Sequence, residues 1–449
     1  MKTPREQVVD LLVDREEKDS YAQIELKHAL KDVERIDKAF ITEVFYGTLK
    51  YQLQIDYILN SYSKTKVKKM KPFIRNLLRM SVYQMLYLDK VPLSAAINEA
   101  FKLTKKRKMN GLSGFVNGIL RTVDRNKDKL PYEDLRFKDI YAYMSIKYSI
   151  PEWIIKMWSE SYDDVTVEEI CKSLNTKAKV CIRVNTLKTD KESLAKELAD
   201  KGVIVSQSHF IEDAMYLQKT DNIVGIDSFN EGKWTVQDES AMLPSCILNP
   251  QSGETILDMC SAPGGKTMHM AAIMNNEGKI VACDIYEHKL ELIQKNANRL
   301  GINIIETRLA DNTNINTEFI GKFDKVLLDA PCSGLGILRR KPDLRLNKTP
   351  EELDEIVKIQ EEIFNNAVRY LKKGGRLVYS TCSISRKENE DMVKKMLEKY
   401  PIELEDITDV VPEILKKYVE DKGMLQILPY YADTDGFFIA SLIKNGDIE

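Results

Sequence analysis

Several features of common protein classes are missing from this sequence of 449 residues. No apolar run approaches the ~18 residues that are needed to cross a bilayer. The first twenty residues, MKTPREQVVDLLVDREEKDS, are charged throughout, so we expect no secretory signal and a cytoplasmic protein without a membrane partner. The length predicts about three domains. A content of 43% hydrophobic and 30% charged residues is typical of a soluble globular chain.

Cysteine and histidine are scarce, and their spacing argues against common metal sites. The nearest two of the seven cysteines lie ten residues apart, so no CxxC is present. The four histidines form neither HExxH nor HxE, which disfavours zinc hydrolases and zinc deaminases. We therefore expect no metal. An odd number of cysteines without a signal peptide indicates reduced thiols and not a disulfide framework.

Charge is nearly balanced over the whole chain but is uneven along it. The formal net charge is −2, from 67 basic and 69 acidic residues. Residues 61–130 nevertheless contain 17 Lys or Arg against four Asp or Glu. The run KKRK at 105–108 would by itself be interpreted as a solvated helix face, but the surplus over the whole segment favours a surface that contacts phosphates.

Hydrophobic periodicity divides the chain into three predicted domains. Residues 1–130 are predicted to be all-helical, because segments such as KPFIRNLLRMSVYQMLYL repeat apolar side chains at the spacing of an amphipathic helix. Residues 145–232 mix helical and strand patterns and predict a small α+β module. In residues 233–449 strands alternate with helices, which predicts an α/β domain with a parallel sheet and helices on both faces.

The ends of the predicted strands in the third domain carry the residues of greatest chemical interest. These strands cover residues 255–260, 279–284, 303–311, 323–331 and 376–382. Ligands of such sheets bind at the carboxyl ends of the strands. We therefore expect one site that gathers Cys260, Asp284, Asp311, Asp329, Cys332 and Cys382.

The segment DMCSAPGGKT, residues 258–267, predicts a turn after the first of these strands. It is not a Walker A loop, because Cys260 stands where that motif needs its first glycine. Asp284 ends the second strand nineteen residues after Gly265, where a carboxylate can bind both hydroxyls of a ribose. Because the carboxylates outnumber Lys266, a nucleoside without phosphate fits better than a polyphosphate, and S-adenosylmethionine is such a nucleoside.

DMCSAPGGKT, DAPCSGLG and STCS, in this order and spacing, resemble the motifs of RNA cytosine-C5 methyltransferases, and the resemblance covers residues 145–449. The helical, basic residues 1–130 are similar to the NusB-like RNA-binding domain. The pairing resembles the Fmu/Sun type of the family, which acts on 16S ribosomal RNA. It implies a Rossmann-like class I methyltransferase sheet, S-adenosylmethionine as cofactor and ribosomal RNA of the small subunit as partner. We expect a monomer.

Two cysteines suit the chemistry of that family. C5 of cytosine is a poor nucleophile, and a thiolate that adds to C6 converts it into an enamine-like carbon that can accept a methyl group. The C5 proton must then leave, which needs a base near the same ring. Position alone does not choose between the cysteines, since Cys332 lies in a Pro-Cys motif like that of the nucleophile in DNA cytosine-C5 methyltransferases. The resemblance assigns Cys382 as nucleophile and Cys332 to proton removal and release.

The resemblance also implies roles for other residues. Asp329 matches the family residue that contacts both the cofactor and the target base. The cofactor contacts of the family map onto Cys260, Ser261, Ala262, Pro263, Gly264, Gly265, Lys266, Asp284, Asp311 and Asp329. The remaining cysteines are expected to be small buried hydrophobic residues, namely Cys171, Cys181, Cys246 and Cys283.

Three alternatives stay open at this point. A P-loop-like nucleotide hydrolase is disfavoured by Cys260 and by the lack of a clear Walker B partner. A non-catalytic RNA-binding or antitermination factor is what the helical domain alone suggests, but the intact motifs around Cys332 and Cys382 argue against it. Transfer RNA is the closest competitor as substrate. The segment WTVQDESAM, residues 234–242, receives no predicted role.

Overall fold

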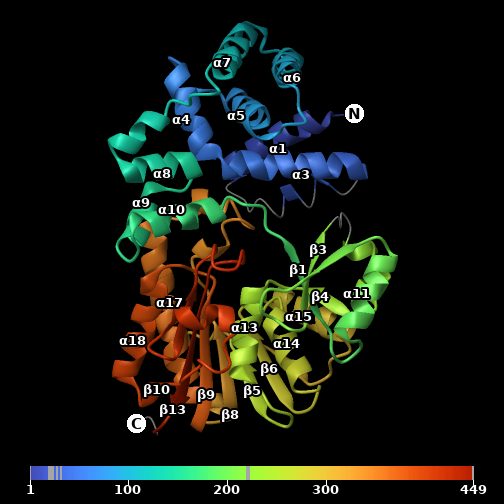
Figure 1. The fold of residues 1–449 in the computed structure, drawn as a ribbon, viewed down its shortest axis with the longest axis vertical. Helices are drawn as coiled ribbons and strands as arrows, with labels where there is room; N and C mark the ends of the chain where they lie inside the picture. The colour runs from blue at the N-terminus through green and yellow to red at the C-terminus, as the bar shows by residue number, and fades with distance from the viewer. Residues whose placement is uncertain (1, 19–24, 27–28, 31–32, 219–222, 447–449) are drawn as a thin grey trace. The chain divides into compact units, whose positions relative to one another are not determined.

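The chain, described here by a computed structural model, divides into two units (Figure 1). Unit 1 comprises residues 1–175 and 341–347, and unit 2 comprises residues 176–340 and 348–449. None of the helices in the described ranges has the length and apolar character that a membrane span requires. The structure describes residues 2–18, 25–26, 29–30, 33–218 and 223–446.

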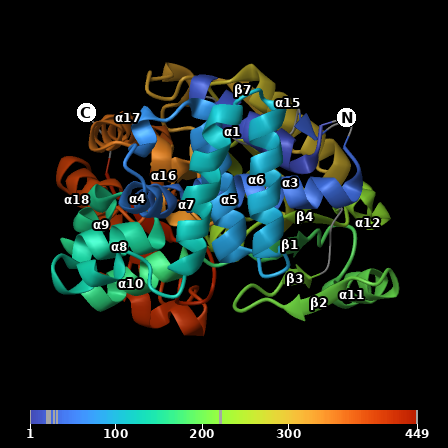
Figure 2. The same ribbon diagram turned by 90° about the horizontal axis from the view of Figure 1, so that it is seen from above.

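Unit 1 is helical, as the amphipathic patterns of residues 1–130 predict. Helix α5 begins at Pro72, where the missing N–H costs no hydrogen bond, and its apolar positions Ile74, Leu77, Leu78 and Val82 are buried. Figure 2 shows α5, α6 and α7 side by side. The α-helices are α1 (Pro4–Lys18), α3 (Arg35–Lys50), α4 (Gln52–Tyr62), α5 (Pro72–Tyr87), α6 (Leu93–Lys106), α7 (Ser113–Arg125), α8 (Ile140–Tyr148), α9 (Glu152–Ser159), α10 (Asp164–Ser173) and α16 (Leu344–Asn347).

Residues 341–347, which contain α16, belong to unit 1 although the chain on both sides of them belongs to unit 2. The guanidinium of Arg345 is buried and donates hydrogen bonds to the carbonyls of Tyr148 and Leu174, each at 2.9 Å, and to Oδ1 of Asn175 at 2.7 Å. Burial lowers the pKa of Arg345 to about 10. No pattern in the sequence indicates this excursion of the chain.

Unit 2 begins with a four-stranded antiparallel sheet in the order β2-β3-β1-β4. Helix α11 is capped by the side chain of Asp190, which accepts from the N–H of Ser193 at 2.8 Å. The segment 234–242, which had no predicted role, supplies β4 and then Asp238, the cap of α13. The elements are β1 (Val180–Val184), α11 (Lys191–Asp200), β2 (Ile204–Gln207), β3 (Ala214–Gln218), α12 (Asp227–Asn230), β4 (Trp234–Val236) and α13 (Glu239–Leu248).

The larger sheet of unit 2 has the order β11-β12-β13-β9-β8-β5-β6-β7 among the described residues, with β10 paired to β13. Strands β5 to β9 are parallel to their neighbours within that group, and β13 is antiparallel to β9. This order, with its switch between β5 and β8, confirms the Rossmann-like fold class. The strands are β5 (Thr255–Asp258), β6 (Lys279–Asp284), β7 (Ile305–Leu309), β8 (Phe323–Asp329), β9 (Leu371–Thr381), β10 (Ile402–Leu404), β11 (Val419–Glu420), β12 (Met424–Ile427) and β13 (Phe437–Lys444).

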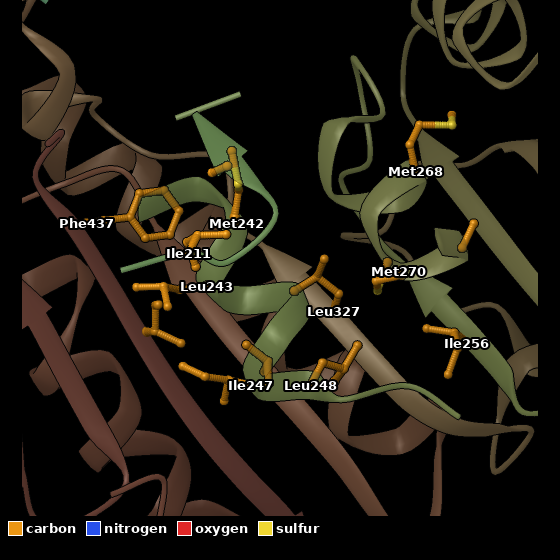
Figure 3. Packing of buried hydrophobic residues seen from close by; sticks show 14 of the residues in the cluster. Ile211, Met242, Leu243, Ile247, Leu248, Ile256, Met268, Met270, Leu327 and Phe437 are labelled. Atoms are coloured by element: carbon orange, nitrogen blue, oxygen red, sulfur yellow. The ribbon is translucent and has the colours of Figure 1, made fainter. Parts of the chain in front are cut away.

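Alternating side chains of the larger sheet enter two hydrophobic cores, because successive residues of a strand point to opposite faces. Ile256, Leu327 and Val378 pack with helices α13, α14 and α15, and Figure 3 shows residues of α13 beside Leu327 and Phe437. Leu257 and Leu328 pack with α17 and α18 on the other face. The remaining helices are α14 (Gly265–Ile273), α15 (Glu287–Leu300), α17 (Pro350–Tyr370) and α18 (Glu390–Lys399).

Candidate active site

Most of the predicted site residues lie along one edge of the larger sheet. Asp258, Asp284 and Asp329 are the last residues of β5, β6 and β8. Cys332 follows β8 by three residues and Cys382 follows β9 directly. Because these four strands are parallel and adjacent, their carboxyl ends meet at the same edge, which is where open α/β sheets bind ligands.

The two cysteines of the site are in contact. Their Sγ atoms lie 3.2 Å apart, and either thiol can donate to the other. Both side chains are partly accessible in the described structure. The contact with Cys382 raises the pKa of Cys332 well above its usual range, and burial and the carboxylates of Glu388 and Asp329 act in the same direction. Cys332 therefore keeps its proton at neutral pH.

The carboxylate of Asp329 is held by two partners. Lys266 Nζ lies 2.6 Å from Oδ2, and the hydroxyl of Ser380 donates to Oδ1 at 2.9 Å. The same lysine lies over the ring of Phe437, with Nζ 5.1 Å from the centroid. Lys266 is thus bound to a carboxylate within the site, which disfavours the role of a P-loop lysine that must reach a phosphate.

The turn after β5 is fixed by the neighbouring strand. The backbone N–H and the hydroxyl of Ser261 both donate to the carbonyl of Cys283, at 2.9 and 2.8 Å. Gly264 has a φ of +97°, and a Cβ atom at this position would lie 3.2 Å from Cε of Met268, so glycine is needed here. The predicted turn is confirmed. Helix α14 begins at Gly265, close after the end of β5, and the first backbone N–H groups of a helix have no carbonyl partner within it.

Two buried carboxyl groups accompany this turn. Oδ1 of Asp284 accepts from the N–H of Tyr286 at 3.0 Å. Asp258 accepts from the hydroxyl of Thr267 at 2.7 Å, and its other oxygen has no hydrogen-bond partner among the described residues. Burial raises the pKa of Asp258 to about 7, so this carboxyl is half protonated near neutral pH.

Asp311 is a predicted site residue whose side-chain hydrogen bonds do not reach the other predicted site residues. Strand β7 ends at Leu309, and Asp311 is exposed two residues later. Its carboxylate accepts from the backbone and hydroxyl of Thr313 and from the amide of Asn314, all within the same turn.

The other cysteines have apolar surroundings. Cys260 packs against the core that contains α17, and burial raises its pKa well above the usual range. Cys171, Cys181 and Cys283 are buried, as predicted. Cys246 is only partly buried, and it packs against the other core, where burial raises its pKa to about 11.

Sequence reasoning missed a group of buried polar residues behind the two cysteines. Glu388 accepts hydrogen bonds from Ser333, Ser383 and Gln360. Asn389 contacts Thr381 and Ser383. In the sequence, Glu388 stands in RKENED, which is typical of a solvated helix start, so no local signal identifies it as a buried residue.

Comparisons with known proteins place these features in context. The family model described as 16S rRNA methyltransferase RsmB/F matches residues 245–443, the NusB family model matches residues 2–125, and a Methyltr_RsmF/B-like ferredoxin-like domain model matches residues 150–223. The chain is 38% identical to the probable ribosomal RNA small subunit methyltransferase B of Bacillus subtilis, over 98% of this chain and 99% of that protein. It is 31% identical to ribosomal RNA small subunit methyltransferase B of Escherichia coli O7:K1, over 91% of each.

Solved structures agree with this relationship. The crystal structure of PH0851 is 28% identical with a TM-score of 0.79, and the match covers 99% of each chain. A methyltransferase homolog protein from Pyrococcus horikoshii is 27% identical with a TM-score of 0.59, and the match covers 68% of this chain and 99% of that one.

Proposed function

The chain belongs to the 16S rRNA methyltransferase RsmB/F family, and on this premise we propose that it transfers a methyl group from S-adenosylmethionine to C5 of a loop cytosine in 16S ribosomal RNA. The observation that carries the proposal is the 3.2 Å contact between the sulfur atoms of Cys332 and Cys382 at the ligand-binding edge of the sheet. Methylation at C5 needs a nucleophile at C6 and a base for the C5 proton on the same small ring. Two thiols in contact meet that requirement.

The residues at the edge of the sheet fit S-adenosylmethionine. Asp284 ends the strand next to β5, where a carboxylate binds ribose hydroxyls. The backbone N–H groups at the start of α14 suit the carboxylate of the amino-acid part of the cofactor. Lys266, the basic residue in the first turn of α14, is bound to Asp329, which fits a ligand without phosphates. When bound, the cofactor supplies the electrophilic methyl group. The full proposed cofactor set is Cys260, Ser261, Ala262, Pro263, Gly264, Gly265, Lys266, Asp284, Asp311 and Asp329.

The two thiols take different roles. Cys382 forms the bond from Sγ to C6 of the cytosine, and the bond breaks again when the C5 proton leaves. The motif positions support this division, because Cys382 stands in STCS at the end of β9 and Cys332 in DAPCSGLG after β8. Cys332 assists the removal of the C5 proton: its partly accessible thiol first releases its own proton to solvent. The thiolate then takes the C5 proton, and the electron pair of the C5–H bond expels the Cys382 thiolate from C6.

Asp329 is proposed to recognise the target base. In cytosine the exocyclic amine N4 is a hydrogen-bond donor, and an aspartate carboxylate is a suitable acceptor for it. Lys266 and Ser380 fix both oxygens of Asp329, so that the carboxylate is oriented before the base arrives. A cytosine can reach this position only when it leaves its stack, which favours a loop or a flipped base as substrate.

Unit 1 is proposed to bind the phosphate backbone of the RNA. Within eight residues around the short helix Val67–Lys69 the chain presents five exposed lysines. Clustered lysines contact phosphates without reading sequence, and each contact releases counterions. The lysines are Lys64, Lys66, Lys68, Lys69 and Lys71.

Bisulfite sequencing of ribosomal RNA tests the proposal. A strain that lacks the gene should lose methylation at one 16S cytosine, and the wild-type gene on a plasmid should restore it. The purified protein should methylate that position in a 16S transcript or a small-subunit particle with labelled S-adenosylmethionine, and should not methylate transfer RNA. If the strain that lacks the gene keeps its 16S methylation and instead loses methylation at a cytosine of transfer RNA, the substrate is transfer RNA.

A further inference from the structure

We propose that Glu388 is a positioning residue that sets the separation of the Cys332 and Cys382 sulfurs by binding the serine that follows each cysteine. This inference rests on the proposed function for its meaning in catalysis, but the geometry behind it is independent of any substrate. Glu388 ends a single turn of 3-10 helix (Arg386–Glu388), and its side chain is fully buried.

The first anchor of Glu388 is the loop of Cys332. Oε1 accepts from the backbone N–H of Ser333 at 2.7 Å, and Oε2 accepts from the hydroxyl of Ser333 at 2.6 Å. Gln360, on α17, donates to Oε1 at 3.3 Å and also to the carbonyl of Pro331 at 2.9 Å. The residues immediately before and after Cys332 are therefore both held by this pair of side chains.

The second anchor is the loop of Cys382. The hydroxyl of Ser383 donates to the same Oε2 atom of Glu388, and the hydroxyls of Ser333 and Ser383 lie 3.0 Å apart. The neighbouring Asn389 accepts from the hydroxyl of Thr381 at 2.6 Å and donates to the carbonyl of Ser383 at 3.2 Å. Cys382 is therefore held on both sides as well, and one carboxylate oxygen joins the two loops.

Packing alone does not explain a buried carboxylate at this position. Taking the charge out of water is unfavourable, and burial raises the pKa of Glu388, although the hydrogen bonds from Ser333, Ser383 and Gln360 act against that rise. A neutral or apolar side chain of the same volume would pack without that cost. What it would lack is a pair of acceptor oxygens: Oε1 receives the N–H of Ser333 and the amide of Gln360, while Oε2 receives the hydroxyls of both serines.

The proposed reaction requires the sulfur atoms of Cys332 and Cys382 to be placed accurately. Misplacing a reacting group by about 1 Å can slow catalysis about 100-fold. The sulfur atoms are attached to residues whose neighbours contact Glu388, so the loss of this acceptor should let the two loops separate while leaving Asp284 and the turn 261–265 in place. Glu388 is thus distinct from the residues proposed to touch the cofactor or the base.

The test combines a geometric readout with a kinetic one. Dibromobimane, which becomes fluorescent when it bridges two neighbouring thiols, reports the Cys332–Cys382 separation without RNA or cofactor, and Cys332→Ser gives the blank. Glu388→Gln should slow the bridging reaction and lower kcat for methyl transfer about 100-fold, with unchanged affinity for S-adenosylmethionine. The matched control is Glu390→Gln, since Glu390 is a buried carboxyl two residues away whose Oε2 has no hydrogen-bond partner among the described residues. This control should behave as the wild type in both assays.

A second variant guards against a simple folding defect. Ser383→Ala removes one of the donors and should slow bridging and turnover to a smaller degree, and the double variant Glu388→Gln/Ser383→Ala should be no worse than Glu388→Gln alone. Wild-type bridging rates in Glu388→Gln, additive effects in the double variant, or a loss of cofactor affinity in parallel with turnover would overturn the proposal. If bridging falls as expected but the wild type makes no 5-methylcytosine, the positioning role stands and the proposed reaction fails.

Discussion

Ser380 lies opposite Asp329 in the register of β8 and β9, and its hydroxyl donates to Oδ1 of Asp329 at 2.9 Å. A strand pairing thus sets the orientation of a carboxylate that the proposed reaction uses. Lys266 holds the other oxygen from the first turn of α14, the helix that follows β5, and β5 is the strand on the opposite side of β8. The sheet therefore brings three separate segments of the chain to one carboxylate.

Replacing Asp329 by Asn should exchange one of its two acceptor oxygens for an NH2 donor, so that the cytosine amine and Lys266 compete for the remaining oxygen, and should leave Lys266 without its anionic partner. We expect kcat/KM for RNA to fall roughly 100-fold, as is typical when a preorganised polar group is lost from an active site. Initial rates with labelled S-adenosylmethionine measure this. Ser380→Ala is the control, because Lys266 still orients the carboxylate, and its effect should be much smaller. A wild-type rate in D329N would rule out contact with the base.

Gly336 brings the loop of Cys332 against two other backbone segments. Its N–H donates to the carbonyl of Cys382 at 2.9 Å, and its carbonyl accepts from Gly436 at 2.9 Å. A Cβ atom on Gly336 would lie 2.1 Å from the carbonyl oxygen of Gly436. Gly336→Ala should therefore push the loops apart, destabilise the fold by about 1–3 kcal/mol, and lower turnover.

Thermal unfolding and dibromobimane bridging measure the effect of G336A, and Gly118→Ala is the control. Gly118 is an exposed residue of α7, and a Cβ atom added there would have no neighbouring atom within 4 Å, so alanine should stabilise the helix by roughly 0.5–1 kcal/mol. Equal melting temperatures for G336A and the wild type would contradict the close backbone approach.

Glu390 should make the stability of the protein depend on pH. Burial raises the pKa of this carboxyl to about 7, whereas a Glu in the unfolded chain titrates near about 4.3. Folding thus favours the protonated form, and the stability that the group contributes is full below about pH 4 and is lost as the pH rises through 7. Because Gln stays neutral, the free energy of unfolding of E390Q minus that of the wild type should be near zero at low pH and should reach roughly 3 kcal/mol at pH 8.

Urea unfolding at several pH values between 4 and 8 measures the effect of E390Q. The other titratable groups are common to both proteins, so they cancel in the difference. A difference that stays constant with pH would mean that Glu390 is not protonated by folding.

The lysines around Val67 should control the salt dependence of RNA binding. A quadruple Lys→Gln variant should weaken binding and reduce the slope of log K against log salt by about 0.7–0.9 for each phosphate contact that is lost. Filter binding over a salt series measures this. The altered residues are Lys64, Lys68, Lys69 and Lys71, and the control has the same change at Lys358, Lys394, Lys395 and Lys399, which are exposed lysines of unit 2. Equal slopes for the two variants would mean that the lysines of unit 1 around Val67 do not bind phosphates.

Much of the sheet could be predicted from the sequence because buried parallel strands are continuous apolar runs that end at turns. Strand β6 has the same bounds as predicted, Lys279–Asp284. Strand β9 begins at Leu371 and not at residue 376, because KKGG resembles a turn while the pairing with β8 continues through an irregular register. The helices of unit 1 also followed the 3.6-residue spacing of apolar positions.

The part of the site that could be predicted lies in short motifs at the strand ends, where Cys332, Cys382 and Asp329 occur. The supporting residues could not be found in this way. Glu388 and Arg345 are charged residues in polar segments, and only the tertiary fold makes them buried. Their partners are distant in sequence, since Glu388 contacts Ser333 and Arg345 contacts Tyr148. A single sequence carries no signal for such pairs.

Covalent trapping of RNA by the two cysteine variants tests the central claim most directly. Cys332→Ala should accumulate an RNA adduct that survives denaturing electrophoresis, because attack proceeds while release stalls, and Cys382→Ala should form no adduct and no 5-methylcytosine. Mass spectrometry of the adduct should place the nucleotide on the peptide that contains Cys382. An adduct on Cys332 in the Cys382→Ala variant, with none in Cys332→Ala, would reverse the assignment of the two thiols.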